Sequence, residues 1–305
     1  MWSQVRALLL RSVYRPLWPV LCGPFARSQL PLTWDEGVLA RAGFPHQVSC
    51  YSCPIINPPA QRHVLENKLY NLGLAISRMQ GLVLQPREIF SFWGRVGCPD
   101  AARGFREAAT LVNRRLTLTV GGGLCQLSGM LYNVALLAGC RILQRYPHSV
   151  DAYGEGRYLP LGRDATVDYP KKDLCFQNPH RYPLVLLLDM TPVNTSGALY
   201  APRARDFSVE IIVSPAEVLP APVRQVLDPS LPAGWRETEP GLDGKRTTAW
   251  RVVNTHHGRS VRECLSRDIY AATPTVVRVG TGVPGEGHGM EVSEGAPPTE
   301  NSPAL

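Results

Sequence analysis

The sequence predicts an α+β protein, with helices packed on a mixed or antiparallel sheet and a small β-rich region near the C-terminus. Apolar residues recur at helical spacing in two segments. Short apolar or alternating segments, which favour strands, fill much of the rest. The 28 prolines and 27 glycines among 305 residues favour many turns and argue against an all-helical bundle.

Composition divides the chain into five segments. Residues 1–61 have little periodicity and are expected to form an irregular extension, whereas residues 62–192 are the most periodic and should form the core domain. A Pro-rich connection with one strand is expected at 193–245, and a β-rich region at 246–280. Residues 281–305 are rich in Gly, Pro, Ser and Glu, which is typical of a disordered tail.

Two helices are predicted in the core domain. In the first, apolar residues recur three or four positions apart and therefore share one face: Leu65, Leu69, Leu72, Ile76 and Met79. Gly81 is expected to end this helix. The second begins at Leu124 or Cys125, directly after three glycines, and runs to Ala138 before Gly139.

Strands are expected where short apolar or alternating stretches lie between turn-forming residues. In the core domain these are residues 141–145, 148–153, 165–169, 174–177 and 184–190, the last being a continuous apolar run typical of a buried strand. Nearer the C-terminus they are 207–213, 247–253, 260–265 and 276–279. The turn-forming stretch 254–258 predicts a hairpin between two of them.

Charge and hydropathy exclude several classes of function. The formal net charge of +7 comes from scattered residues rather than a basic run, so no nucleic-acid partner is expected. Arg11 and Arg15 interrupt the apolar N-terminal stretch, which is too short for a secretory signal, and no stretch is long enough to span a bilayer. A soluble cytoplasmic protein is the expectation, with the extracytoplasmic envelope as the alternative.

The eight cysteines are not spaced as in a small disulfide scaffold, and most are expected to be thiols. Cys50 and Cys53 form a Cys-x-x-Cys pair, which could be half of a zinc site. No second close pair accompanies it, so two loop cysteines or a redox pair are favoured. No metal and no other cofactor is predicted.

The sharpest chemical feature is the run Gly121-Gly122-Gly123-Leu124-Cys125-Gln126. A cysteine at a helix N-terminus faces the positive end of the helix dipole and unpaired N–H groups, which stabilise a thiolate and could stabilise an oxyanion. Downstream, His148 is a candidate general base, and Asp164 or Asp168 could orient it. The candidate substrate-binding residues are Gly121, Gly122, Gly123, Gln126 and Ser128.

Other interpretations of this run stay open. The order Cys, His, Asp is analogous to transglutaminase-like and papain-like enzymes in topology only. Cys125 could equally be a small buried residue behind a tight helix entry. Phosphate binding fits less well, because Cys125-Gln126 stands where a P-loop requires Lys followed by Ser or Thr.

A series of short motifs runs through about residues 62–190. They are Asn67-x-x-x-Asn71-Leu72, Phe90-Ser91-Phe92-Trp93, Gly97, Gly104-Phe105-x-x-Ala108, Gly121 to Ser128, Arg145-x-x-His148-Ser149, Asp164 to Val167, Asp173-Leu174 and Asn178. In order and spacing these motifs resemble those of the VanW-like family. Residues 241–280 look like the tail of short family members and faintly resemble the β-strand module named for five glycines, common in cell-wall proteins. One departure is Pro86-Arg87-Glu88, where the family usually has Pro-Gly-Glu.

The resemblance implies an accessory protein of the bacterial cell envelope, of a family named for vancomycin resistance, with peptidoglycan or a wall precursor as the partner. It supplies no established catalytic residues. The catalytic roles of Cys125, His148 and Asp164, which match its motifs, are therefore inferred from the residues alone.

Three functions follow from these observations. The first is an amidase, peptidase or transpeptidase in which Cys125 attacks a carbonyl. The second is a non-catalytic module that binds cell-wall peptide or glycan. The third is a redox or metal-linked structural protein that uses Cys50 and Cys53. The sequence alone does not distinguish among these three functions, and it does not predict an oligomeric state.

Overall fold

Residues 36–56, 62–112 and 115–282 are described by the structure, a computed structural model of the chain. They form two compact units. The first contains the described residues from 36 to 220 together with Asp243–Thr273, and the second contains Ala221–Leu242 together with residues 274–282. Every residue of the candidate site lies in the first unit.

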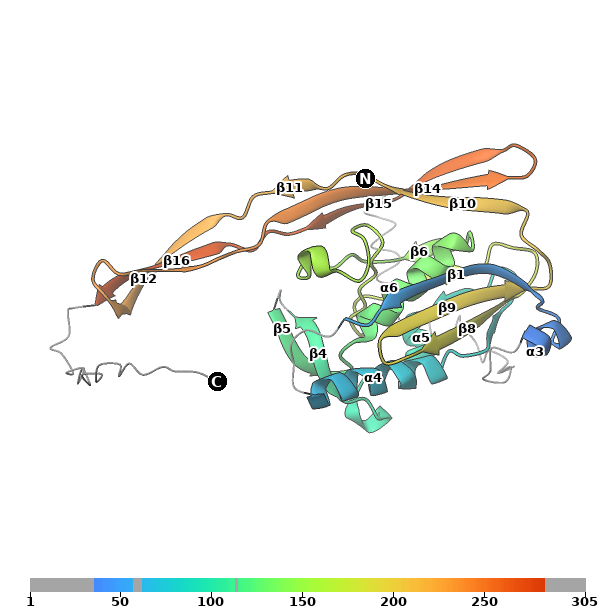
Figure 1. Ribbon diagram of the computed structural model, residues 1–305, viewed down its shortest axis with the longest axis horizontal. Coiled ribbons are helices and arrows are strands. Elements are labelled where there is room, and N and C mark those ends of the chain that lie inside the picture. Colours follow the sequence, from blue (N-terminus) through green and yellow to red (C-terminus); the bar gives the residue numbers. More distant parts are fainter. Residues whose placement is uncertain (1–35, 57–61, 113–114, 283–305) are drawn as a thin grey trace, which may run out of the picture. The chain divides into compact units, whose positions relative to one another are not determined.

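An antiparallel sheet of four strands forms the centre of the first unit (Figure 1). Its strand order is β1-β9-β8-β2, formed by β1 (His46–Pro54), β9 (Asn194–Ala201), β8 (Leu184–Met190) and β2 (Leu82–Leu84). As the continuous apolar run predicts, β8 is buried from Leu184 to Leu188. One face of the sheet packs against α6 (Leu124–Leu137), and Leu39 of α3 (Glu36–Arg41) packs on the other.

Both predicted helices are confirmed. The first apolar repeat forms α4 (Arg62–Ser77) and the second forms α6, and just beyond each helix a glycine has a positive φ of 72°. Every residue of α6 from Leu124 to Leu136 is buried except Cys125, which is half-buried. The helix is therefore a core element, and Cys125 is the residue of its first turn that is not fully buried.

The other strands of the first unit form two small sheets and a longer one. The small sheets are β3-β7-β6, from β3 (Ile89–Ser91), β7 (Cys175–Gln177) and β6 (Arg141–Gln144), and the pair β4 (Glu107–Val112) with β5 (Arg115–Val120). The longer sheet has β14 (Gly244–Thr255) at its centre, paired with β10 (Phe207–Val213), β11 (Glu217–Leu219) and β15 (Ser260–Tyr270). A short helix α5 (Phe92–Val96) follows β3.

The second unit is a sheet of three strands. β12 (Val223–Pro232) runs parallel to β16 (Thr275–Gly282), and β13 (Arg236–Glu239) pairs with β16 in the antiparallel sense. Strands therefore outnumber helices along the described chain, and the C-terminal region is rich in β-structure as expected. The helices α4 and α6 give the first unit its α+β character.

The segment boundaries differ from those predicted. Within the expected irregular extension, residues 46–54 form the edge strand β1, while residues 1–35 lie outside the described structure. The Pro-rich segment 193–245 holds β9, β11, β12 and β13 in addition to β10. The expected C-terminal region 246–280 is divided, because β14 and β15 belong to the first unit and β16 to the second. β16 reaches residue 282, and the rest of the predicted tail lies outside the described residues.

Two predicted strands, residues 148–153 and 165–169, are loops. Side-chain contacts replace a sheet ladder in both. His148 N donates to Asp164 Oδ2 at 2.8 Å, and Ala165 O accepts a hydrogen bond from Ser128 at 2.6 Å. The alternating pattern of these segments thus reflects burial around Asp164 rather than strand pairing.

Cys50 and Cys53 do not form a joint site. They lie three residues apart on β1, where side chains alternate between faces, and Cys50 is exposed whereas Cys53 is buried. The seven cysteines of the described chain are free thiols, and its residues contain no cluster of His, Cys, Asp or Glu able to hold a metal. Nor does any described helix have the length and apolar character needed to cross a bilayer.

Candidate active site

The glycine run forms a tight turn that places Cys125 at the start of α6. Asn71 of α4 anchors the turn, since its Nδ2 donates to Gly122 O at 3.1 Å and its Oδ1 accepts from Arg106 N at 2.8 Å. A Cβ on Gly122 would lie 2.2 Å from the carbonyl oxygen of Ala108. Glycine is therefore required at position 122 because the β4 backbone passes directly over it.

The first turn of α6 leaves several N–H groups unbonded. Three N–H groups of the turn already donate to backbone carbonyls, namely those of Gly121, Gly122 and Gln126. Among the described residues, the N–H groups of Gly123, Leu124 and Cys125 have no such acceptor. These free donors lie at the positive end of the helix dipole, beside the Cys125 thiol, where they can stabilise negative charge.

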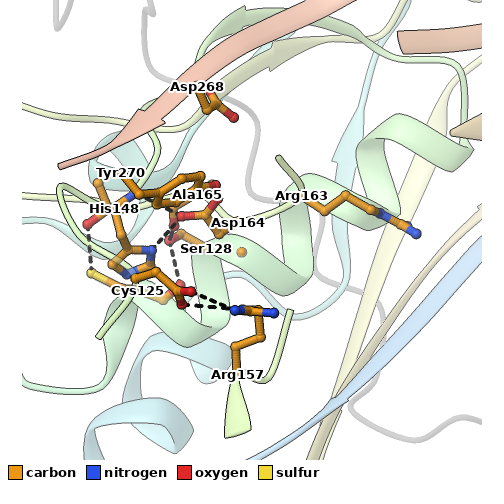
Figure 2. A network of polar contacts seen from close by, with 12 residues as sticks. Cys125, Ser128, His148, Arg157, Arg163, Asp164, Ala165, Asp268 and Tyr270 are labelled. Atoms are coloured by element: carbon orange, nitrogen blue, oxygen red, sulfur yellow. Dashed lines mark hydrogen bonds and ion pairs between the residues drawn. The ribbon is translucent and has the colours of Figure 1, made fainter. Parts of the chain in front are cut away.

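His148 and Asp164 form a tight pair next to Cys125, as Figure 2 shows. His148 Nδ1 lies 2.6 Å from Asp164 Oδ2, and the same oxygen accepts the backbone N–H of His148 at 2.8 Å. The hydrogen bonds of Cys125 Sγ are to Thr166 Oγ1 at 3.3 Å and to Val167 O at 3.4 Å. His148 lies close enough for its charge and hydrogen-bonding capacity to lower the pKa of Cys125, and Cys125 in turn raises the pKa of His148.

Asp164 is held in turn by two residues on its other oxygen. Its Oδ1 accepts from Arg145 Nη2 at 2.8 Å and from the Tyr270 hydroxyl at 2.5 Å. Arg145 also forms an ion pair with Asp268, in which its Nη1 contacts Oδ1 at 2.7 Å and Oδ2 at 2.6 Å. Because these groups are almost completely buried, the orientation of the carboxylate is set before any substrate arrives. Asp168, the other candidate, is exposed, and its backbone pairs with Lys172.

The electrostatics of the site favour a thiolate–imidazolium pair. Burial alone raises the pKa of Cys125, but hydrogen bonds and charge from His148, with contacts to Thr166 and Val167, outweigh burial and lower it. Burial lowers the pKa of His148, but the bonds to Asp164 and Cys125 raise it to about 10. Burial would raise the pKa of Asp164 as well, yet His148, Arg145 and Tyr270 hold it well below its usual range. At neutral pH His148 is therefore an acid poised to give a proton.

Lys68 is an unexpected member of the site. This α4 residue is 8% exposed, and its Nζ donates to Ile56 O. Burial lowers the pKa of Lys68 to about 8, and the thiolate charges of Cys53 and Cys125 act in the opposite direction. Gly123 has a φ of 98°, and a Cβ there would lie 2.7 Å from Lys68 Cγ, so this glycine leaves room for the lysine stem.

Several predicted substrate-binding residues have structural roles. Ser128 is fully buried, and its hydroxyl donates to Ala165 O at 2.6 Å with Cys125 O at 3.1 Å, so in this structure it serves the packing of α6 and has no surface open to substrate. Gln126 is also buried, and its Nε2 donates to Pro54 O. Gly121 and Gly122 shape the turn, which leaves Gly123 as the predicted glycine whose N–H group has no backbone acceptor among the described residues.

Two cavities border the network. One of about 30 Å³ lies beside His148 and Asp164 and is lined by Tyr153, Tyr158 and Tyr270 among others, with room for about one or two waters. A second, of about 320 Å³, lies between β6 and β15 and reaches Arg145, but Cys125 and His148 do not line it. Neither cavity is lined by Cys125 itself, which is partly buried.

Sequence patterns missed Lys68, Arg145, Asp268 and Tyr270 as site residues. Arg145 stands in the motif that contains His148, which was the one signal that could have indicated its role. Tyr270 and Asp268 approach from β15, 106 residues beyond Asp164 and 123 residues beyond Arg145 respectively. No local pattern reports contacts at such separations.

Comparisons with known proteins agree with the resemblance. Residues 67–200 match the family described as VanW like protein, and residues 211–282 match the G5 domain. Over 121 residues the chain is 36% identical to "Uncharacterized protein YoaR" of Bacillus subtilis (strain 168), covering 40% of this chain and 39% of that protein. Over 114 residues it is 38% identical to "Vancomycin B-type resistance protein VanW" of Enterococcus faecalis (strain ATCC 700802 / V583), and the match covers 37% of this chain and 42% of that protein. The chain thus spans about two fifths of the length of these curated relatives.

Two solved G5 domains are similar to about a quarter of the chain. "IgA1 Protease G5 domain structure" is 19% identical with a TM-score of 0.20, covering 26% of this chain and 95% of that one. "Crystal structure of HP0197-G5" is 22% identical with a TM-score of 0.17, and the match covers 25% of this chain and 100% of that one. These scores carry no argument about shape. The faint resemblance predicted for residues 241–280 is confirmed by the sequence match, which starts earlier, at residue 211.

Proposed function

Since this chain carries a VanW-like domain followed by a G5 domain, we propose that it is a cell-envelope protein whose Cys125 attacks an amide of peptidoglycan or a precursor. The observation that carries this proposal is the His148–Asp164 pair beside Cys125, which lowers the pKa of the thiol at the start of α6, where backbone N–H groups have no acceptor among the described residues. Nucleophile, proton donor and oxyanion donors are the three parts that acyl transfer requires. The extracytoplasmic alternative for its location accords with this substrate.

The proposed reaction begins with the ion pair. The Cys125 thiolate adds to the carbonyl carbon, and the electron pair of the C=O bond moves to oxygen, near the N–H groups of Gly123 to Cys125. When the carbonyl re-forms, the C–N bond breaks and His148 gives its proton to the leaving amine. Water or a second amine then attacks the thioester, His148 takes the proton back, and Cys125 leaves as thiolate.

If water attacks the thioester the reaction is hydrolysis, and if a second amine attacks it the reaction is transpeptidation. We expect purified protein incubated with peptidoglycan fragments to form a covalent acyl adduct on Cys125, detectable by peptide mass spectrometry. Cys125→Ala should abolish adduct and product while the fold survives, and Cys264→Ala, which removes an exposed thiol outside the site, should change neither. Product formation that persists in Cys125→Ala would contradict the proposal.

A second candidate is a non-catalytic module that binds cell-wall peptide or glycan. The G5 match supports it, because it adds a second domain of a type common in wall proteins. On this hypothesis the protein binds muropeptides saturably, and Cys125→Ala binds them equally well without any turnover by either form. Turnover of muropeptides by the unaltered protein would rule out this non-catalytic function.

A further inference from the structure

The Lys68 ammonium is buried and only partly bonded. An ammonium has three donors, and the acceptor that Lys68 uses is Ile56 O. Among the described residues, no aspartate or glutamate forms an ion pair with it. A buried cation without a carboxylate partner is costly, and such groups usually face an anion.

The stem of Lys68 lies against the turn that leads into the candidate nucleophile. Its stem lies against Gly123, two residues before Cys125, and both Cys53 of β1 and Cys125 of α6 act on its charge. Gln126, the neighbour of Cys125, is 3% exposed, and its Oε1 has no hydrogen-bond partner in the described structure. Gln126 Oε1 is an acceptor and does not bind an anion, so the group here that suits a negatively charged ligand is the Lys68 ammonium, two of whose donors have no acceptor among the described residues.

We propose that Lys68 forms an anion subsite beside Cys125, which binds a carboxylate of the substrate close to the carbonyl under attack. This inference rests on the proposed function and narrows its substrate class. The preferred substrate is an acidic peptide with a free carboxylate a few bonds from the scissile amide, either a C-terminal or a side-chain carboxylate. The Lys68 charge orients that group, so Lys68 is a specificity-determining residue.

Two alkylating reagents of nearly equal size test the subsite. Iodoacetate carries a carboxylate one bond from the reacting carbon, whereas iodoacetamide is neutral. At pH 7, peptide mass spectrometry gives the iodoacetate-to-iodoacetamide rate ratio at Cys125, with the exposed Cys50 and Cys264 as internal references. We expect a ratio about tenfold above the references, and salt should change it little because the Lys68 charge is buried.

Variants assign the preference to Lys68. Lys68→Met should bring the ratio at Cys125 down to that of the references, and Lys68→Arg should retain most of it. If Lys68 served only the thiolate, Lys68→Met would slow both reagents equally and leave the ratio unchanged. A ratio that survives in Lys68→Met, or one that equals the references in the unaltered protein, would overturn the inference.

A second measurement, the pH dependence of the iodoacetate-to-iodoacetamide rate ratio at Cys125, uses the unaltered protein. It therefore does not depend on whether a Lys68 variant folds. Lys68, with a pKa near 8, loses its charge before His148, whose pKa is about 10. The ratio should consequently fall with a midpoint at about pH 8, and a midpoint near 10 would assign the preference to His148 instead. Outright failure of Cys125 to react with iodoacetamide is a distinct result. It would contradict the proposed function, and the subsite would fall with it.

Discussion

The hydroxyl of Tyr270 donates a hydrogen bond of 2.5 Å to Asp164 Oδ1, across 106 residues of chain. The same hydroxyl accepts the N–H of Gly162 at 2.8 Å, and Ala271 N donates to Ser149 O at 2.8 Å. The end of β15, within the G5 match, is thereby joined to the two loops that carry His148 and Asp164. The site is complete only when this strand is in place.

Tyr270→Phe tests this connection. The change removes the donor to Asp164 and leaves the buried Gly162 N–H without its acceptor, so we expect a loss of about 1–3 kcal/mol in the free energy of unfolding. Tyr169→Phe is the matched control, because Tyr169 is exposed and should change stability by less than about 0.5 kcal/mol. Denaturant titration measures both, and equal stabilities of the two variants would contradict the role of Tyr270.

Asp164→Asn should lower the pKa of His148 from about 10 towards its ordinary value of 6.5, because the carboxylate that favours the imidazolium is lost. The Cys125 thiol should then lose a charged partner and titrate at higher pH. NMR titration of the His148 ring measures the shift. Asp168→Asn, at the exposed alternative position, should leave His148 unchanged, and the reverse result would assign the pair to Asp168.

The pKa of His148 also sets the sign of a stability effect. Because the pKa is about 10 when folded and near 6.5 when unfolded, the folded state holds the extra proton between these values. The contribution of His148 to stability is full below about pH 6.5 and is lost as pH rises to about 10. Denaturant titrations across this range should show a smaller decline in His148→Gln than in the unaltered protein. An identical decline in both would contradict the raised pKa.

Gly122→Ala should destabilise the turn before Cys125, since the new Cβ would lie 2.2 Å from Ala108 O and backbone must move. The expected cost is about 1–3 kcal/mol or more. Gly156→Ala is the control, because a Cβ there meets nothing within 4 Å and Gly156 does not have positive φ. Similar unfolding midpoints for the two variants would show that the close approach of β4 does not restrict position 122.

Arg87→Gly should stabilise the protein. Arg87 is the non-glycine residue with positive φ (65°) in the described chain, at the position where the motif usually has glycine. A left-handed conformation costs an L-residue roughly 1–2 kcal/mol, and glycine avoids this cost. Glycine also raises the entropy of the unfolded state, which offsets part of the benefit, so we expect the free energy of unfolding to rise by up to about 1 kcal/mol. Arg87→Ala keeps the Cβ and should gain nothing. Equal stability of the Gly and Ala variants would contradict this explanation.

Local patterns predicted what is locally determined. The apolar repeat of Leu65 to Met79 and the glycine run before Cys125 identified both major helices, because helical periodicity depends on neighbours in sequence. The apolar run at 184–190 likewise identified β8. In contrast, the alternation at 148–153 and 165–169 suggested strands, whereas contacts to Asp164 and Ser128 hold these segments as loops.

The sequence predicted which types of residue form the candidate site, but it did not predict how those residues are arranged in space. Cys125, His148 and Asp164 carry recognisable chemistry, and the fold brings them together. Lys68 looks like an ordinary solvent-facing residue on the helix pattern, and only tertiary packing buries it against Gly123. Ser128 looks available to substrate next to the cysteine, yet its helix is buried on nearly all sides.

The decisive measurement is the pH dependence of Cys125 alkylation by iodoacetamide, resolved by peptide mass spectrometry. We expect the Cys125 rate to rise at a lower pH than the rates of the exposed Cys50 and Cys264, because the pKa of Cys125 is lowered. Asp164→Asn should move the Cys125 curve towards higher pH. A Cys125 curve that coincides with those of Cys50 and Cys264, or a thiol that never reacts in the folded protein, would contradict an activated nucleophile at this site.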